Sequence, residues 1–182
     1  MPIPARIATL QLLATYNRWM NEKVYAAAGT LSDEELARDR GAFFGSILGT
    51  LNHLVVGDTL WLQRFARHPR VGGPLAPVLA LPAPAALDAT VFAHLPELQR
   101  RRAELDAWIV DWIPTIGEPD LDGALAYANT KGQPQSRNFG GLLLHVFNHQ
   151  THHRGQVTTL LAQAGVDVGV TDLVALVPEQ AV

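Results

Sequence analysis

Four long stretches of this chain carry apolar residues at steps of three and four, and this period is the feature that most limits its fold. Such spacing places the apolar side chains on one side of an α-helix, where they are buried against other helices. The stretches cover residues 5–28, 47–67, 88–112 and 138–164. A chain of 182 residues is long enough for one sizeable core, so we predict an all-α fold in a single domain over residues 1–182.

The ends of these helices are marked by residues with strong local preferences. Gly29 and Gly165 each follow a stretch and suit the turn that ends a helix. Ser46 directly precedes the second stretch and is a good N-cap. Pro96 lies inside the third stretch. Because proline lacks a backbone N–H, it either kinks that helix or moves its start to about residue 96.

The segments between the helices indicate how the chain connects them. The Ser-Asp-Glu-Glu sequence at residues 32–35 predicts a short helical turn. Residues 68–86 contain five prolines and form a connector long enough to cross the end of a bundle. Residues 125–129 and 133–137 flank a Thr-Lys-Gly turn and predict a small hairpin. We therefore predict an antiparallel four-helix bundle with a crossover connection, a small hairpin or irregular insert before the last helix, and an apolar tail over residues 167–182 that packs on the bundle.

Composition limits the partners and the compartment. The formal net charge is −3, whereas proteins that bind nucleic acid without sequence preference are usually basic, so we expect no nucleic-acid partner. The chain has no cysteine, which excludes disulfides, thiolate metal ligands and a cysteine nucleophile. No stretch has the roughly 20 uninterrupted apolar residues of a membrane span. Residues 1–4 do not resemble the start of a signal peptide, so we expect a cytoplasmic protein without a membrane partner.

Histidines are concentrated in the last helical stretch. Four of the seven, His145, His149, His152 and His153, fall within nine residues. At about 100° per residue, His153 lies roughly 40° and His149 about 80° from the centre of the apolar side, whereas His145 and His152 lie about 120° and 140° away. His149 and His153 are also four residues apart, so one ion can reach both rings. We predict that these two are metal ligands and that the other two lie in an outer shell or face solvent.

Two ligands from one helix rarely make a tight site, so we expect a third from a facing helix. His53 is the only histidine within the helical part of the second stretch, and Gly57, one turn later, is expected to leave room beside its ring for a substrate or ligand. Three neutral imidazoles leave at least one coordination position open, as in catalytic sites. The alternative is that His53 is a hydrogen-bonded core residue and that the chain binds no ion.

Other polar residues have both a functional and a structural interpretation. Asp58 is a candidate general base or outer-shell carboxylate, or it faces water; Asn52 either orients a ligand ring or makes a local hydrogen bond. Several arginines are candidates for binding an anionic substrate, although a solvated face is the simpler interpretation for each. They are Arg64, Arg100, Arg101, Arg102 and Arg154. The chain has no phosphate loop, nucleophile elbow or His-Glu-x-x-His sequence, so no catalytic residue is assigned.

Two blocks of sequence resemble a known family. One runs through Ser46-Ile47-Leu48-Gly49-Thr50-Leu51-Asn52-His53-Leu54 and residues 58–65, and the other is His145 with Asn148-His149-Gln150-Thr151-His152-His153-Arg154-Gly155-Gln156. Together with residues 16–21, they are similar to the DinB/YfiT-like family of metal-dependent four-helix-bundle proteins. The similarity extends over nearly the whole chain.

The resemblance implies a metal site, a fold and an assembly. It implies that His53, His149 and His153 hold a divalent ion, with zinc or nickel as the usual metals. It also implies a crossover bundle and a homodimer. Relatives of this fold include thiol S-transferases and a thiol-dependent isomerase. We therefore expect thiol S-transferase-like chemistry on a small-molecule substrate with a low-molecular-weight thiol as cosubstrate. A metal-dependent hydrolase, a non-catalytic metal-binding dimeric bundle, and a metal-free helical protein are the alternatives.

Overall fold

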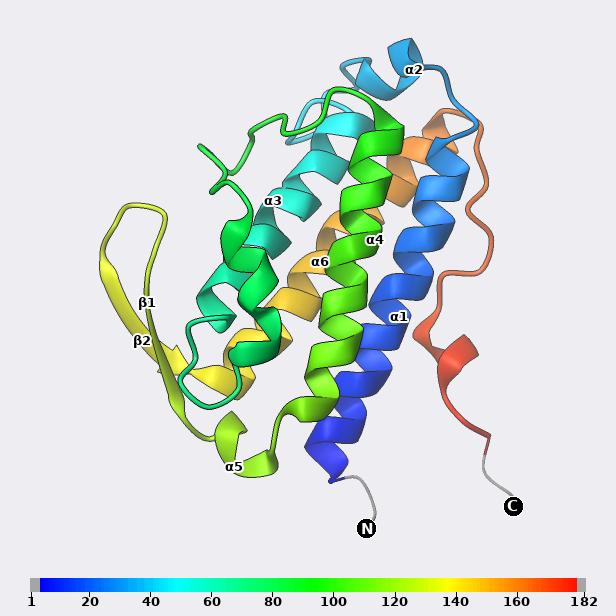
Figure 1. Cartoon of the computed structure of the whole chain (residues 1–182). Coiled ribbons are helices and arrows are strands. Elements are labelled where there is room, and N and C mark those ends of the chain that lie inside the picture. Colours follow the sequence, from blue (N-terminus) through cyan, green and yellow to red (C-terminus); the bar gives the residue numbers. More distant parts are fainter. Residues whose placement is uncertain (1–3, 180–182) are drawn as a thin grey trace.

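The computed structural model describes residues 4–179 and is mostly helical, with one small two-stranded sheet. Four long helices lie side by side (Figure 1). They are α1 (Ala5–Ala28), α3 (Ile47–Phe65), α4 (Leu95–Trp112) and α6 (Phe139–Gln163). Both α1 and α3 pack against α4 and α6, so the apolar sides of all four helices share one core.

The helix ends agree with the predictions at most positions. The bounds of α1 are those expected, and α3 ends two residues earlier, at Phe65. The hydroxyl of Ser46 accepts a hydrogen bond from the backbone N–H of Gly49 at 2.9 Å, which confirms the predicted N-cap. The start of α4 at Leu95 confirms the second interpretation of Pro96, because the proline lies in the first turn, where no N–H is needed.

The connections contain more local structure than the sequence indicated. The helical turn at residues 32–35 is present as α2 (Asp33–Ala37), and the Pro-rich connector contains a 3₁₀ helix, η1 (Gly73–Ala80). Three further short helices follow the long ones; they are η2 (Ile113–Thr115), α5 (Glu118–Leu121) and η3 (Leu173–Leu176). Helices this short are not visible in the sequence, because one turn does not establish a period.

The predicted hairpin is confirmed. Strands β1 (Ala124–Ala128) and β2 (Pro134–Asn138) pair antiparallel, and Gly132 in the connecting turn has a positive φ of 74°. The hairpin projects beside α3 and α6 (Figure 1) and contacts α3 through Tyr127, whose ring centroid lies 5.4 Å from that of Trp61.

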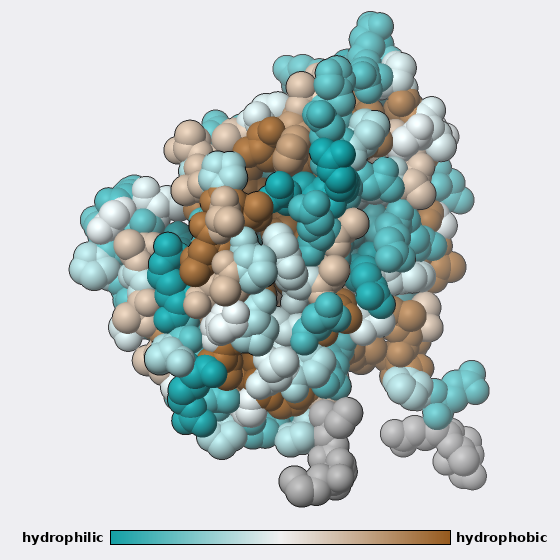
Figure 2. All heavy atoms as spheres, in the orientation of Figure 1, coloured by the Kyte–Doolittle hydropathy of each residue, from teal (hydrophilic) through white to brown (hydrophobic). Residues whose placement is uncertain are grey.

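The surface and the tail complete the described part of the chain. Hydrophilic side chains cover the outward side of α4 (Figure 2), which is the side opposite its core contacts. Residues 167–179 of the predicted tail lie along α1, where the Tyr16 hydroxyl donates to the carbonyl of Thr171 at 2.7 Å, and residues 180–182 lie outside the described part. The outer valines of the tail are not buried, since Val170 and Val174 are 60% and 72% exposed. Over residues 4–179, no helix combines the length and apolar character needed to cross a lipid bilayer.

Candidate metal centre

Three histidine rings from two helices meet at one point. The Nε2 atom of His53, on α3, lies 3.0 Å from Nε2 of His149 and 3.2 Å from Nε2 of His153, both on α6. The ring centroids of His149 and His153 are 4.4 Å apart. The structure therefore brings together the three residues that the sequence selected, and we call them the three-histidine cluster.

The hydrogen bonds on the far side of two rings fix which nitrogen carries the proton. Nδ1 of His53 donates to the carbonyl of Leu87 at 2.8 Å, and Nδ1 of His153 donates to the side-chain oxygen of Gln156 at 2.9 Å. A neutral imidazole has one N–H, so both Nε2 atoms present lone pairs to each other at 3.2 Å. Two facing lone pairs repel unless a cation lies between them, and a shared metal ion would remove this repulsion.

The spacing of the nitrogens also suits a metal ion. Metal–nitrogen bonds of about 2.0–2.1 Å in tetrahedral geometry place ligand nitrogens roughly 3.3 Å apart. The separations from His53 of 3.0 and 3.2 Å are close to that value. Hydrogen bonds that orient the far nitrogen of each ligand ring are typical of histidine metal sites. The donor set and its outer contacts therefore fit a divalent ion.

Close packing holds the three rings. Phe44 stacks on the ring of His53 with centroids 3.8 Å apart and planes 17° apart, and it meets His153 edge-on. Gly57 lies directly against His149, because a Cβ atom at residue 57 would be 3.0 Å from Cε1 of that ring. The prediction that Gly57 leaves room for a substrate or ligand is therefore wrong, because the ring of His149 fills that space.

The environment favours neutral imidazoles. Burial, with a smaller contribution from the other histidines, lowers the pKa of His149 to about 3. Burial also lowers the pKa of His53 and of His153. All three rings are thus neutral at physiological pH, which is the state that binds a metal.

The remaining histidines lie outside the cluster. His145 and His152 are exposed, as predicted, although the ring of His145 contacts Trp61 edge-on with centroids 5.2 Å apart. His68 is buried beside Phe139 and accepts backbone hydrogen bonds, while His94 pairs with Asp33.

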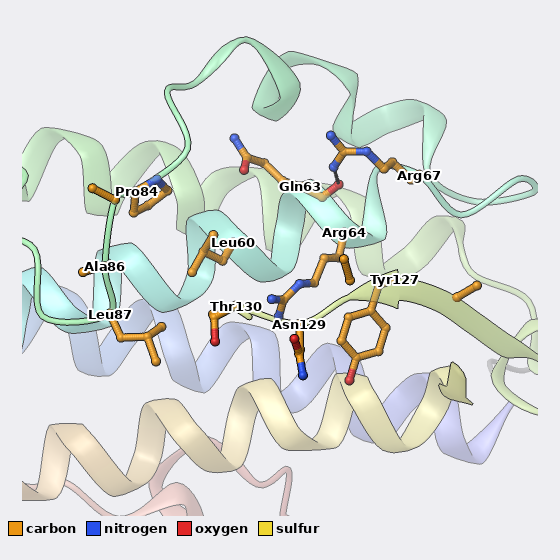
Figure 3. Close-up of a pocket in the computed structure, with 13 residues that line it drawn as sticks. Leu60, Gln63, Arg64, Arg67, Pro84, Ala86, Leu87, Tyr127, Asn129 and Thr130 are labelled. Carbon is orange, nitrogen blue, oxygen red and sulfur yellow. Dashed lines mark hydrogen bonds between the residues drawn. The ribbon is translucent and has the colours of Figure 1, made fainter. Parts of the chain in front are cut away.

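A pocket of about 850 Å³ (Figure 3) is lined in part by a residue that hydrogen-bonds to the cluster. Its walls come from the second half of α3, from residues 84–87 of the connector and from residues 126–130 of the hairpin. Leu87 belongs to this wall and is also the residue whose carbonyl accepts the hydrogen bond from His53. This size is within the usual range for small-molecule sites.

Asp58 and Arg102 are buried in the core, whereas the simpler interpretation of each was a residue that faces solvent. Nη1 of Arg102 lies 2.7 Å from Oδ2 of Asp58, and Nη2 lies 3.0 Å from Oδ1 of Asp106. All three residues are at most 2% exposed. The interpretations of Asp58 as a general base and of Arg102 as a solvated residue are therefore wrong, because both charges are neutralised inside the core.

Arg154 is likewise buried, and it extends the same network. It donates to the side-chain oxygens of Asn17 and Gln150, and Asn17 donates to Asp106 at 2.9 Å. Asn21 donates to both oxygens of that carboxylate at 3.0 Å. We call the residues joined in this way the buried charge network; they are Asn17, Asn21, Asp58, Arg102, Asp106, Gln150 and Arg154.

Helical periodicity in the sequence indicates that two of these residues face the core. At about 100° per residue, Gln150 lies roughly 20° and Arg154 about 60° from the centre of the apolar side of α6, both nearer than His149. Asn52 makes the predicted local hydrogen bond, since its amide donates to the carbonyl of Leu48 at 3.0 Å, and it does not orient a ligand ring. Its side-chain oxygen accepts from the backbone N–H groups of Val91 and Phe92.

Comparison with known proteins identifies the family of this chain. The model of the DinB family matches residues 6–180. A curated relative, Protein DinB of Bacillus subtilis (strain 168), is 28% identical over 160 residues, which cover 88% of each chain. The three-histidine cluster lies within the matched region. The chain belongs to the DinB family.

Proposed function

We propose that this protein is a metal-dependent enzyme in which His53, His149 and His153 hold one divalent ion, zinc or nickel. The observation that carries the proposal is the convergence of three Nε2 atoms, all within 4.8 Å of one another, with two of the rings oriented by hydrogen bonds on their far nitrogens. Three protein ligands leave a coordination position for a small molecule.

We propose thiol S-transfer as the reaction. A divalent ion bound to the cluster would act as a Lewis acid that lowers the pKa of a thiol or a water molecule at the open position. The chain has no cysteine, so the thiol belongs to a low-molecular-weight cosubstrate. In such a transfer the sulfur forms a bond to an electrophilic carbon, and the leaving group departs with the electron pair of the broken bond.

The residues of the chain would orient the ligands and bind the substrate. The Leu87 carbonyl and the Gln156 side chain hold two ligand rings in the tautomer with a free Nε2. Phe44 covers one side of the His53 ring and limits access of water there. The adjoining pocket supplies space for a small-molecule substrate.

Elemental analysis tests the metal site. Protein purified without a histidine tag is expected to contain about one ion per chain, and His53→Ala, His149→Ala and His153→Ala should each lose it. His152→Ala is the matched control, because His152 is an exposed neighbour on the same helix and should keep full metal content. Substoichiometric metal that is unchanged in His149→Ala would reject the site.

Turnover assays separate the reactions. We expect conjugation of an electrophile with glutathione or a similar thiol, lost in His53→Ala. Ester or amide hydrolysis without thiol transfer would favour the hydrolase instead. A chain that binds metal stoichiometrically and turns over neither class of substrate would favour a non-catalytic binding module.

The proposal extends to the whole chain. We propose one metal-binding domain over residues 1–182, with α1, α3, α4 and α6 forming an antiparallel four-helix bundle with a crossover. The mutual packing of these helices supports it. We also propose a cytoplasmic homodimer without nucleic-acid or membrane partners. Light scattering on the purified protein should give twice the chain mass of 19.8 kDa.

A further inference from the structure

We propose that Arg64 forms an anion-binding subsite, so that the small molecule taken by the metal centre carries a carboxylate or a phosphate. This inference rests on the proposed function, because it names the class of substrate for the same site. Arg64 lines the pocket of about 850 Å³ whose wall also contains Leu87, the residue that accepts the hydrogen bond from His53.

The guanidinium of Arg64 is held in place but has no anionic partner. Its Cζ atom lies 4.6 Å from the ring centroid of Trp61 and 5.0 Å from that of Tyr127. Within residues 4–179 its side chain makes no hydrogen bond or ion pair with the protein. The two rings also contact each other, with centroids 5.4 Å apart, so the guanidinium lies against one aromatic pair while its N–H groups stay available for a carboxylate or phosphate.

The walls of the pocket have a positive charge. They include Arg64 and Arg67 and no aspartate or glutamate. Figure 3 shows the guanidinium of Arg64 directed toward Thr130 and Asn129 at the end of the hairpin strand. Burial lowers the pKa of Arg64, yet an arginine remains a cation at neutral pH. A chain with a net charge of −3 thus keeps two cations, without carboxylates, in the walls of one pocket.

Arg64 and the metal centre are placed to bind the two ends of one molecule. On α3, His53, Leu60 and Arg64 fall within about 40° of one another, so they lie along the same side of the helix. The Cα atoms of His53 and Arg64 are separated by about 16 Å along the helix axis, and the arginine side chain leans back toward the N-terminal end. A ligand on the order of 10 Å long reaches both, about the length of an extended tripeptide.

Calorimetric titration of the metal-loaded protein tests the subsite with two matched pairs of probes. S-methylglutathione is compared with its diethyl ester, and glucose 6-phosphate with glucose. S-methylglutathione has no free thiol, so it cannot bind the metal as a thiolate, and the Arg64 variants separate binding in the pocket from coordination of the metal by a carboxylate or the amine. We expect at least one anionic probe to bind about tenfold or more tightly than its neutral counterpart. The pair that shows the preference identifies the anion.

Substitutions of Arg64 test whether this residue causes the preference for the anionic probe. Arg64→Gln should reduce it to less than about twofold, and Arg64→Lys, which keeps the charge but loses the planar fork, should retain part of it. Arg100→Gln, at an exposed arginine of α4 outside the pocket, should bind as the wild type does. If Arg64→Gln does not fold, the comparison of Arg64→Lys with the wild type decides, because an unchanged preference contradicts the proposal.

Metal content separates this inference from the proposed function. Full metal content with no preference for either anion overturns the Arg64 subsite and leaves the metal centre standing. An anion preference that is lost in Arg64→Gln, in a protein that binds no metal, supports the subsite and overturns the proposed function.

Discussion

Gly57→Ala is the substitution that most directly tests whether close packing against α3 positions the ring of His149 for metal binding. Gly57 lies inside α3, and a Cβ atom there would stand 3.0 Å from Cε1 of His149. That contact is tighter than carbon atoms normally make, so the ring must move by a few tenths of an ångström. Alanine in a helix interior is otherwise favoured over glycine by about 1 kcal/mol.

The gain in helix propensity changes the stability of the protein, whereas the close contact with His149 changes its metal affinity. We expect the metal-free Gly57→Ala protein to be no less stable than the wild type, because the gain in helix propensity offsets the strained contact. We expect its metal affinity to fall about tenfold, equivalent to about 1.4 kcal/mol, because the displaced ring no longer meets the other two ligands at the right distance. Competition with a chromophoric chelator measures the affinity, and urea denaturation measures the stability.

Gly155→Ala is the matched control. Gly155 lies inside α6, and a Cβ atom there would meet nothing within 4 Å. This variant should gain about 1 kcal/mol, or roughly 2–4 °C in melting temperature, with unchanged metal affinity. Equal metal affinities in the two variants would refute the reasoning, since they would mean that the close contact at Gly57 does not position His149.

Two further predictions concern stability. Arg102→Met leaves the buried carboxylate of Asp58 without a partner and that of Asp106 with only the amides of Asn17 and Asn21. We therefore expect denaturant titration to show a loss of about 3–5 kcal/mol, against less than about 0.5 kcal/mol for the exposed Arg100→Met. A loss below 1 kcal/mol would show that the carboxylates do not depend on Arg102. The second prediction concerns pH. The ring of His149 stays neutral in the folded state down to about pH 3, whereas the same ring in the unfolded chain is protonated near pH 6.5. The metal-free protein should therefore lose stability as the pH falls below 6.5, by about 1 kcal/mol between pH 7.5 and 5 after allowance for partial exposure of the ring. Urea midpoints at the two pH values should differ less in His149→Asn, and an equal difference would contradict the assignment to this ring.

The sequence was most informative where a single residue type dictates local geometry. Ser46 and the apolar period predicted α3 to within two residues, and Pro96 predicted the later start of α4 as one of two interpretations. Helical spacing alone singled out His149 and His153, whose rings meet that of His53. These features depend on local rules, which a sequence expresses directly.

The features that the sequence did not predict depend on partners far along the chain. Arg102 and Asp58 are buried because each neutralises the other across two helices, and surface exposure is the usual state of such residues. The position of Asp58 opposite α4 follows only once α3 and α4 are packed. The pocket walls likewise combine α3 with the connector and the hairpin, whose relative positions no local pattern specifies.

Each turn of α6 that carries a ligand ring also carries a buried polar group. His149 is followed by Gln150, and His153 by Arg154, so each of these histidines of the cluster is next to a residue of the buried charge network. A shift of α6 by one residue would rotate it by about 100°, which would separate the imidazoles and unpair Arg154 at once. The angular position of this helix is therefore fixed by polar contacts that need no ion. In the proposed enzyme, substitutions in the pocket walls near the hairpin would therefore leave the orientation of the imidazoles unchanged.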